Sequence, residues 1–131
     1  MRRLHLIVGL LAIAAFLLTG MIMRTHTPPL IGLSSEIRMM YRSRHLYILA
    51  AAIANLLLGL YLRLQPAGWR RILQYLGSIL FLVAPVLLIL AFAAEPPAGL
   101  TGNTGRSSFG QYALFGGAVA HFLGAAGTKP K

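Results

Sequence analysis

Four long apolar segments contain none of the fourteen charged residues of the chain. They cover residues 4–23, 45–62, 72–94 and 109–126, and each is 18 to 23 residues long. An α-helix rises about 1.5 Å per residue, so each segment crosses, or nearly crosses, the roughly 30 Å hydrocarbon core of a bilayer. They also exceed the ~9–11 residues of a barrel strand and do not alternate. The sequence therefore predicts an all-α, polytopic membrane protein, with residues 1–131 forming one four-helix transmembrane bundle.

The basic residues flank these segments. The net charge of +10 could indicate nucleic acid, but no basic stripe with interleaved aromatic residues lies outside the apolar segments. Cations beside membrane helices contact lipid phosphates. We therefore expect no nucleic-acid partner and expect contacts with membrane lipids, including anionic headgroups.

An even number of crossings places both termini on one side of the membrane. Seven Lys and Arg residues then lie on that side and five on the other, which favours cytoplasmic N and C termini. The first apolar segment is longer than the ~7–15 residues typical of a signal peptide, so we expect it to be retained as a helix. The expected location is a bacterial-type cytoplasmic (inner) membrane.

The connections differ in character. Gln65-Pro66-Ala67-Gly68 predicts a tight turn between the second and third helices, because Pro and Gly break helices. Ser34 or Ser35 is suited to cap a second helix that begins at residue 36, ahead of its apolar segment. The stretch from Glu95 to Gly105 is rich in Gly, Pro and Thr, and it predicts an exposed loop.

Basic residues cluster just before the second apolar segment. Arg38, Arg42 and His45 follow i, i+4, i+7 spacing and share one helical face, and Arg44 lies nearby. The expected role of Arg38, Arg42 and Arg44 is contact with anionic lipid headgroups. A site for an anionic ligand or partner, or a quinone site that includes His45, is an alternative.

Polar residues inside the apolar segments are candidates for function, because burying them unpaired is costly. His5, Gln74, Tyr75, Ser78 and His121 lie toward the same membrane face, with His5 nearest the headgroups, and helix rotation decides whether they converge. Two neutral imidazoles on separate helices can ligate a haem iron. The candidate ligands for haem b or a quinone are thus His5, His45 and His121, although no cofactor at all is the first expectation.

Other residues predict helix packing. Gly116, Ala120 and Gly124 are spaced four apart, Gly117 lies in a neighbouring row of small residues with His121, and such rows let helices approach closely. Asn55, midway along the second apolar segment, is expected to hydrogen-bond across helices.

The two acidic residues, Glu36 and Glu95, are too few for a paired-carboxylate active site, and no catalytic motif or cysteine is present. We therefore expect neither a catalytic nor a metal site. The expected function is an accessory, anchor or scaffold subunit, as a homo-oligomer or in a larger membrane complex. A haem- or quinone-binding redox anchor and an oligomeric conduit for small solutes or ions are the alternatives.

Overall fold

The computed structural model describes residues 1–66, 68–99 and 104–126. Within these ranges the chain is all-helical and has no β-strand, as predicted. Lys129 and Lys131 lie outside the described residues, as does the 100–103 part of the third connection. The four long helices are α1 (Arg2–Thr25), α2 (Ser35–Tyr61), α3 (Trp69–Ala98) and α4 (Gly105–Ala125), and a short 3-10 helix, η1 (Leu30–Gly32), precedes α2.

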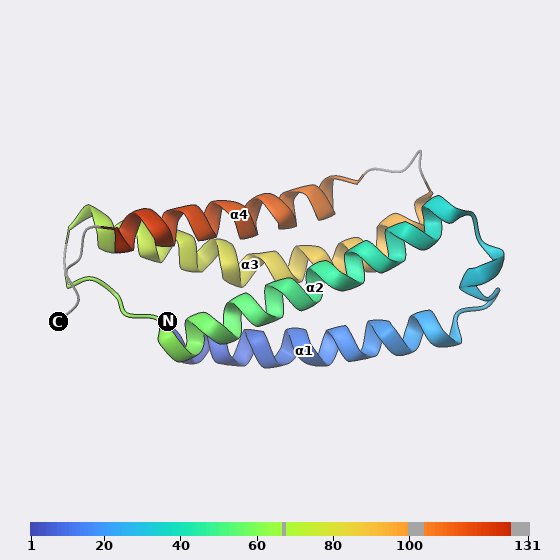
Figure 1. The fold of residues 1–131 in the computed structure, drawn as a ribbon, viewed down its shortest axis with the longest axis horizontal. Coiled ribbons are helices and arrows are strands. Elements are labelled where there is room, and N and C mark those ends of the chain that lie inside the picture. The colour runs from blue at the N-terminus through green and yellow to red at the C-terminus, as the bar shows by residue number, and fades with distance from the viewer. Residues whose placement is uncertain (67, 100–103, 127–131) are drawn as a thin grey trace.

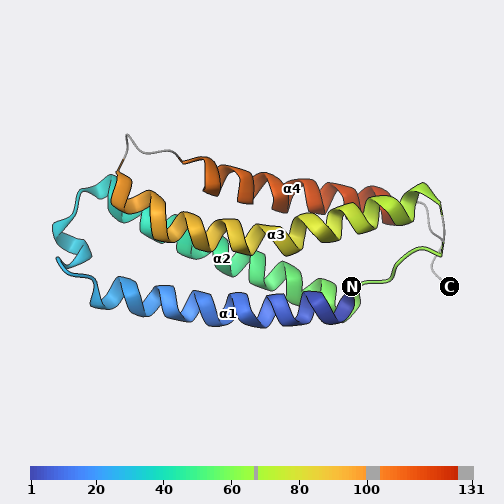
Figure 2. The same ribbon diagram turned by 180° about the vertical axis from the view of Figure 1, so that it is seen from behind.

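The helices form two hairpins that pack side by side. Consecutive helices run in opposite directions, so α1 begins at the end of the molecule where α4 finishes (Figure 1). The most extensive contacts join α3 to α4 and α1 to α2, and α2 against α3 connects the two hairpins. Both views place α1 and α4 on the outside, with α2 and α3 between them (Figure 2). Side chains shared by the hairpins therefore lie mainly at the α2–α3 interface.

Three of the described helices, α1, α2 and α3, are long and apolar enough to cross a membrane. Helix α4 has 21 residues, but glycines and polar residues such as Gln111 and His121 dilute its apolar content. The fold thus matches a membrane helical protein on three helices, and α4 meets that description by length only.

Local sequence explains where α2 begins. The side chain of Ser34 accepts a hydrogen bond from the backbone N–H of Ile37 at 3.4 Å, and Glu36 lies in the first turn, where the helix dipole favours negative charge. Helix α2 begins at Ser35, one residue before the start expected from the sequence, and runs for 27 residues. The part of α2 ahead of the apolar segment, residues 35–44, makes nearly three turns and carries Arg38, Arg42 and Arg44.

Helix α3 ends later than the sequence predicts. The expected exposed loop begins only at Gly99, because α3 continues through Pro96 and Pro97 to Ala98. Glu95 is therefore helical and only 1% exposed. Proline has a helix-compatible φ but no N–H, so Pro96 and Pro97 each remove one backbone hydrogen bond from the last turns of α3, and the helix continues without those two bonds. Gly99, with φ of 69°, then ends the helix in a conformation that favours glycine.

Candidate functional site

Asn55 replaces a backbone hydrogen bond that the neighbouring helix lacks. It is fully buried on α2, and its Nδ2 donates to the carbonyl of Ala51 at 2.9 Å and to that of Phe81 on α3 at 2.7 Å. In an uninterrupted helix, the Phe81 carbonyl would accept from the backbone N–H of residue 85, which is a proline without that N–H. Asn55 therefore supplies the donor that Pro85 lacks.

The same asparagine determines which ring nitrogen of His5 carries the hydrogen. The Nδ1 atom of His5, on α1, lies 2.8 Å from Oδ1 of Asn55. Because both Asn55 donor bonds fix its amide orientation, Oδ1 faces the ring, and an amide oxygen only accepts. His5 Nδ1 therefore donates, and Nε2 of the neutral ring carries the lone pair. His5 is fully buried, and its Nε2 has no hydrogen-bond partner among the described residues.

The remaining polar residues of this end make separate contacts. Ser78 on α3 lies 3.2 Å from Nε2 of His121 on α4. Gln74 bonds the turn before α3: it accepts from the N–H of Gln65 at 2.8 Å and donates to a carbonyl at 3.3 Å. Tyr75 pairs with Arg71 of its own helix, on the surface. The five residues expected to converge thus divide into separate groups, and only the His5 and His121 contacts join different helices.

Two of the candidate haem ligands, His5 and His121, contact polar side chains of neighbouring helices. His5 binds Asn55 through Nδ1, and His121 uses Nε2, a common iron ligand, to contact Ser78. None of the pockets described for this chain is lined by a histidine. Within the described ranges, no group of three or more His, Asp or Glu residues could hold a metal ion. The polar interior therefore serves contacts between helices.

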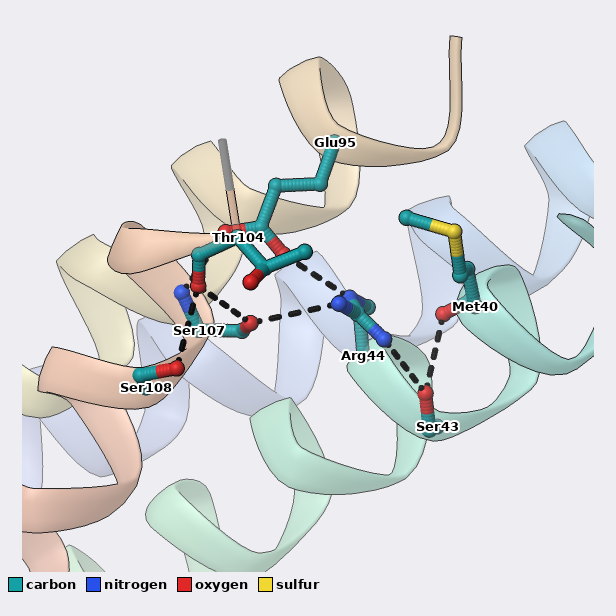
Figure 3. A network of polar contacts seen from close by, with 7 residues as sticks. All are labelled: Met40, Ser43, Arg44, Glu95, Thr104, Ser107 and Ser108. Atoms are coloured by element: carbon teal, nitrogen blue, oxygen red, sulfur yellow. Dashed lines mark hydrogen bonds and ion pairs between the residues drawn. The ribbon is translucent and has the colours of Figure 1, made fainter. Parts of the chain in front are cut away.

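An ion pair joins three helices at the opposite end of the molecule (Figure 3). Arg44 Nε on α2 donates to Oε2 of Glu95 on α3 at 2.9 Å. The other carboxylate oxygen, Oε1, accepts from the backbone N–H of Ser107, in the first turn of α4, at 2.8 Å. Arg44 also donates to the hydroxyls of Ser107 at 3.3 Å and Ser43 at 3.0 Å. We call these four residues, Ser43, Arg44, Glu95 and Ser107, the Arg44 cluster.

Glu95 also caps α4. Thr104 occupies the N-cap position but provides no side-chain cap bond. The carboxylate of Glu95 satisfies one of the free N–H groups at the start of α4, where negative charge is favoured. One buried side chain therefore neutralises Arg44 and fixes the end of a neighbouring helix.

The structure separates the three arginines expected to contact headgroups. The Arg44 side chain is 13% exposed and turns toward Glu95 (Figure 3), whereas Arg38 and Arg42 line a surface pocket. Arg44 follows Arg42 by two residues, or about 200° around a helix, so it leaves the face of Arg38 and Arg42. That offset was the sequence signal for a different role of Arg44.

His45 lies in the α1–α2 interface. Its ring stacks on Phe16 with centroids 4.0 Å apart, and its Nδ1 lies 2.8 Å from the hydroxyl of Thr19. Neither Thr19 nor His26 was a candidate from the sequence. The Nε2 atom of His26 lies 3.2 Å from the hydroxyl of Tyr41. No local pattern indicated either pair, because each joins separate parts of the chain.

The small residues of α4 face α3 of the same chain. A Cβ added to Gly117 would lie 2.9 Å from the Phe81 ring and 3.0 Å from the Gly77 carbonyl, and one on Gly124 would lie 2.7 Å from Gln74. By contrast, Gly116 and Ala120 are half-buried, and a Cβ on Gly116 would meet only the end of a leucine, at 3.4 Å. The closest contact therefore runs through Gly117 and Gly124.

No protein-family model matches this chain, and neither the curated proteins nor the solved structures include a match. The chemistry of the described residues is therefore the basis for a functional assignment.

Replacing Asn55 with alanine is expected to lower the free energy of unfolding by about 2–4 kcal/mol, because the Phe81 carbonyl and His5 Nδ1 both lose a buried partner. In a chain that already carries Pro85→Ala, the same replacement is expected to cost less. Alanine at 85 returns an N–H to the Phe81 carbonyl, which leaves only His5 unpaired. SDS titration in mixed micelles, followed by circular dichroism, measures both costs. Equal costs in the two backgrounds would contradict the proposed repair of α3 by Asn55.

Proposed function

We propose that this chain is a multi-pass integral membrane protein that acts as a non-catalytic accessory, anchor or scaffold subunit of a membrane complex. The length and apolar character of α1, α2 and α3 support the membrane placement. We propose α4 as the fourth crossing, because residues 109–126 carry no charge and α4 lies along α3. Large apolar side chains are exposed on the outer face of α1, including Leu10, Leu11 and Leu17. Such a face is suited to lipid or to a partner helix.

The observation that carries the functional proposal is the pairing of interior polar groups. Asn55 bonds α3, His121 meets Ser78, and Glu95 bonds both Arg44 and α4. A conduit or a catalytic centre needs polar groups that face a cavity or a substrate. Here those groups hold helices together, which supports a structural role.

The orientation and the membrane are also proposals. Seven basic residues on the side of the termini against five on the other favour cytoplasmic termini. We propose a bacterial-type cytoplasmic membrane. Gly117 and Gly124 pack against α3 of the same chain. A second copy or a larger partner would therefore contact other faces of the bundle.

Blue native electrophoresis of mildly solubilised membranes from the cells that produce the protein tests the accessory role. We expect the chain to migrate in a species much heavier than its own 14.2 kDa, together with other subunits that mass spectrometry identifies. Migration as the chain alone would contradict the subunit proposal.

A redox anchor is the second candidate, because His5 Nε2 is buried and has no partner among the described residues. Absorption spectra of the purified chain, oxidised and dithionite-reduced, separate the two candidates. The accessory role predicts a flat visible spectrum. A Soret band that sharpens on reduction and disappears in His5→Ala, but not in His45→Ala, would favour the redox anchor.

A further inference from the structure

A pocket between two arginines lies on the first turns of α2. Its volume is about 310 Å³, and its lining residues are Ser35, Arg38, Met39 and Arg42. Arg38 and Arg42 are one helical turn apart and share a face. Neither arginine makes a side-chain hydrogen bond or an ion pair within the described part of the chain. The pocket therefore carries two positive charges without a bound counter-charge.

The nearest carboxylate does not fill this role. Glu36 is close enough to interact electrostatically with Arg38, but it is exposed and lies in the first turn of α2, where the helix dipole favours its negative charge. Glu95 is the other acidic residue of the chain, and it is buried against Arg44. Each carboxylate thus lies at the start of a helix, Glu36 at that of α2 and Glu95 at that of α4.

Apolar surface adjoins the charged pocket. A second pocket, of about 490 Å³, shares Ser35 and Met39 with the first, and Met40 and Tyr47 add apolar surface to it. Its polar rim is formed by Glu36, Ser43 and Arg44. Met39 separates the two and is 70% exposed. A ligand that fits both pockets has an anionic group beside the arginines and a hydrocarbon part beside Met39 and Tyr47.

The depth of the arginines matches a lipid headgroup. Arg42 and Arg38 precede the apolar segment that begins at residue 45 by three and seven residues, or about 5 and 10 Å of helix. This places them beyond the hydrocarbon, where lipid phosphates lie. A guanidinium donates several N–H bonds in a plane and suits phosphate oxygens.

We propose that these two pockets bind one anionic phospholipid, whose phosphate contacts Arg38 and Arg42 and whose upper acyl chain lies against Met39 and Tyr47. Arg44 also lines the second pocket, but Glu95 neutralises its charge, so Arg38 and Arg42 alone are proposed to contact the phosphate. This inference rests on the membrane placement proposed above. It does not depend on an accessory role or on any protein partner.

Native mass spectrometry of the full chain tests the site. The chain is released from micelles that contain equal amounts of dioleoyl phosphatidylglycerol and dioleoyl phosphatidylcholine, and the retained lipid is counted. We expect the unmodified chain to retain phosphatidylglycerol preferentially. The double variant Arg38→Gln/Arg42→Gln is expected to lose about thirtyfold in that preference, since each basic residue near anionic lipid contributes about 1 kcal/mol and every 1.4 kcal/mol is about tenfold.

The matched control is Arg24→Gln/Arg106→Gln. It removes the same charge from exposed positions in the last turn of α1 and the first turn of α4, and neither residue lines the two pockets. This control is expected to keep the preference, and Arg38→Lys/Arg42→Lys is expected to keep part of it. Far-UV circular dichroism confirms that each variant is folded before its lipid is counted.

Three outcomes would overturn the site. An equal loss in the control would indicate diffuse charge attraction, and an unchanged Arg38/Arg42 variant would place the lipid elsewhere. Competition by sn-glycerol 3-phosphate at equal concentration would indicate a soluble phosphate ligand in place of a lipid. Carbonate extraction of the membranes separately tests integration, so a failure of the membrane placement is distinguishable from a failure of the lipid site.

Discussion

Replacing Glu95 with alanine is expected to lower the free energy of unfolding by about 3–5 kcal/mol, the cost of leaving one member of a buried ion pair without its partner. Glu95 is 1% exposed, and Arg44 has no other carboxylate beside it among the described residues. The change also removes the acceptor for the backbone N–H of Ser107 at the start of α4. SDS titration in mixed micelles, with the midpoint and slope compared with the unmodified chain, measures this cost.

Two controls separate the ion pair from a general effect of charge. Glu36→Ala removes the only other carboxylate of the chain from an exposed position and is expected to have a much smaller effect. Adding Arg44→Met to Glu95→Ala is expected to recover much of the loss, because the unpaired charge is then gone. If Glu95→Ala alone were as mild as Glu36→Ala, the ion pair would have no structural role.

The sequence indicated the helical class because the determinants of that class are local. Charge-free length predicts an apolar helix in any surroundings, and Ser34 and Glu36 mark a helix start within four residues of chain. The end of α3 could not be predicted in this way. Pro96 and Pro97 normally end a helix, and whether α3 continues depends on what covers Glu95. That cover comes from α2 and α4.

The candidate site was less predictable for the same reason. Arg44 and Glu95 are 51 residues apart in sequence, and only the rotation of α2 and α3 brings them together. Both residues lie outside the charge-free apolar segments, so the sequence predicted that they would be exposed. In the structure Glu95 is buried and the Arg44 side chain is only 13% exposed, because each neutralises the charge of the other. Asn55 was recognisable as a residue that bonds across helices. Its acceptor, the carbonyl left free by Pro85, required the register of α2 against α3.

Adding a single methyl group at Gly117 is expected to lower the free energy of unfolding by about 1–3 kcal/mol, the usual cost of overfilling a packed interface. The Cβ of Gly117→Ala would lie 2.9 Å from the Phe81 ring and 3.0 Å from the carbonyl of Gly77. A side chain can rotate away, but a backbone carbonyl moves only with its helix. Helix α4 must therefore shift away from α3, and the contact between Ser78 and His121 should weaken with it.

The adjacent glycine provides the control for this prediction. Gly116→Ala adds the same methyl group one residue away, where the nearest atom is Leu80 Cδ1 at 3.4 Å, an ordinary contact with a flexible side chain. Alanine favours a helix over glycine by about 1 kcal/mol, so this variant is expected to be neutral or more stable than the unmodified chain. SDS titration of both variants compares them directly. Equal stabilities would mean that α3 and α4 do not meet through Gly77 and Gly117, and the positions of Ser78 and His121 would then need revision.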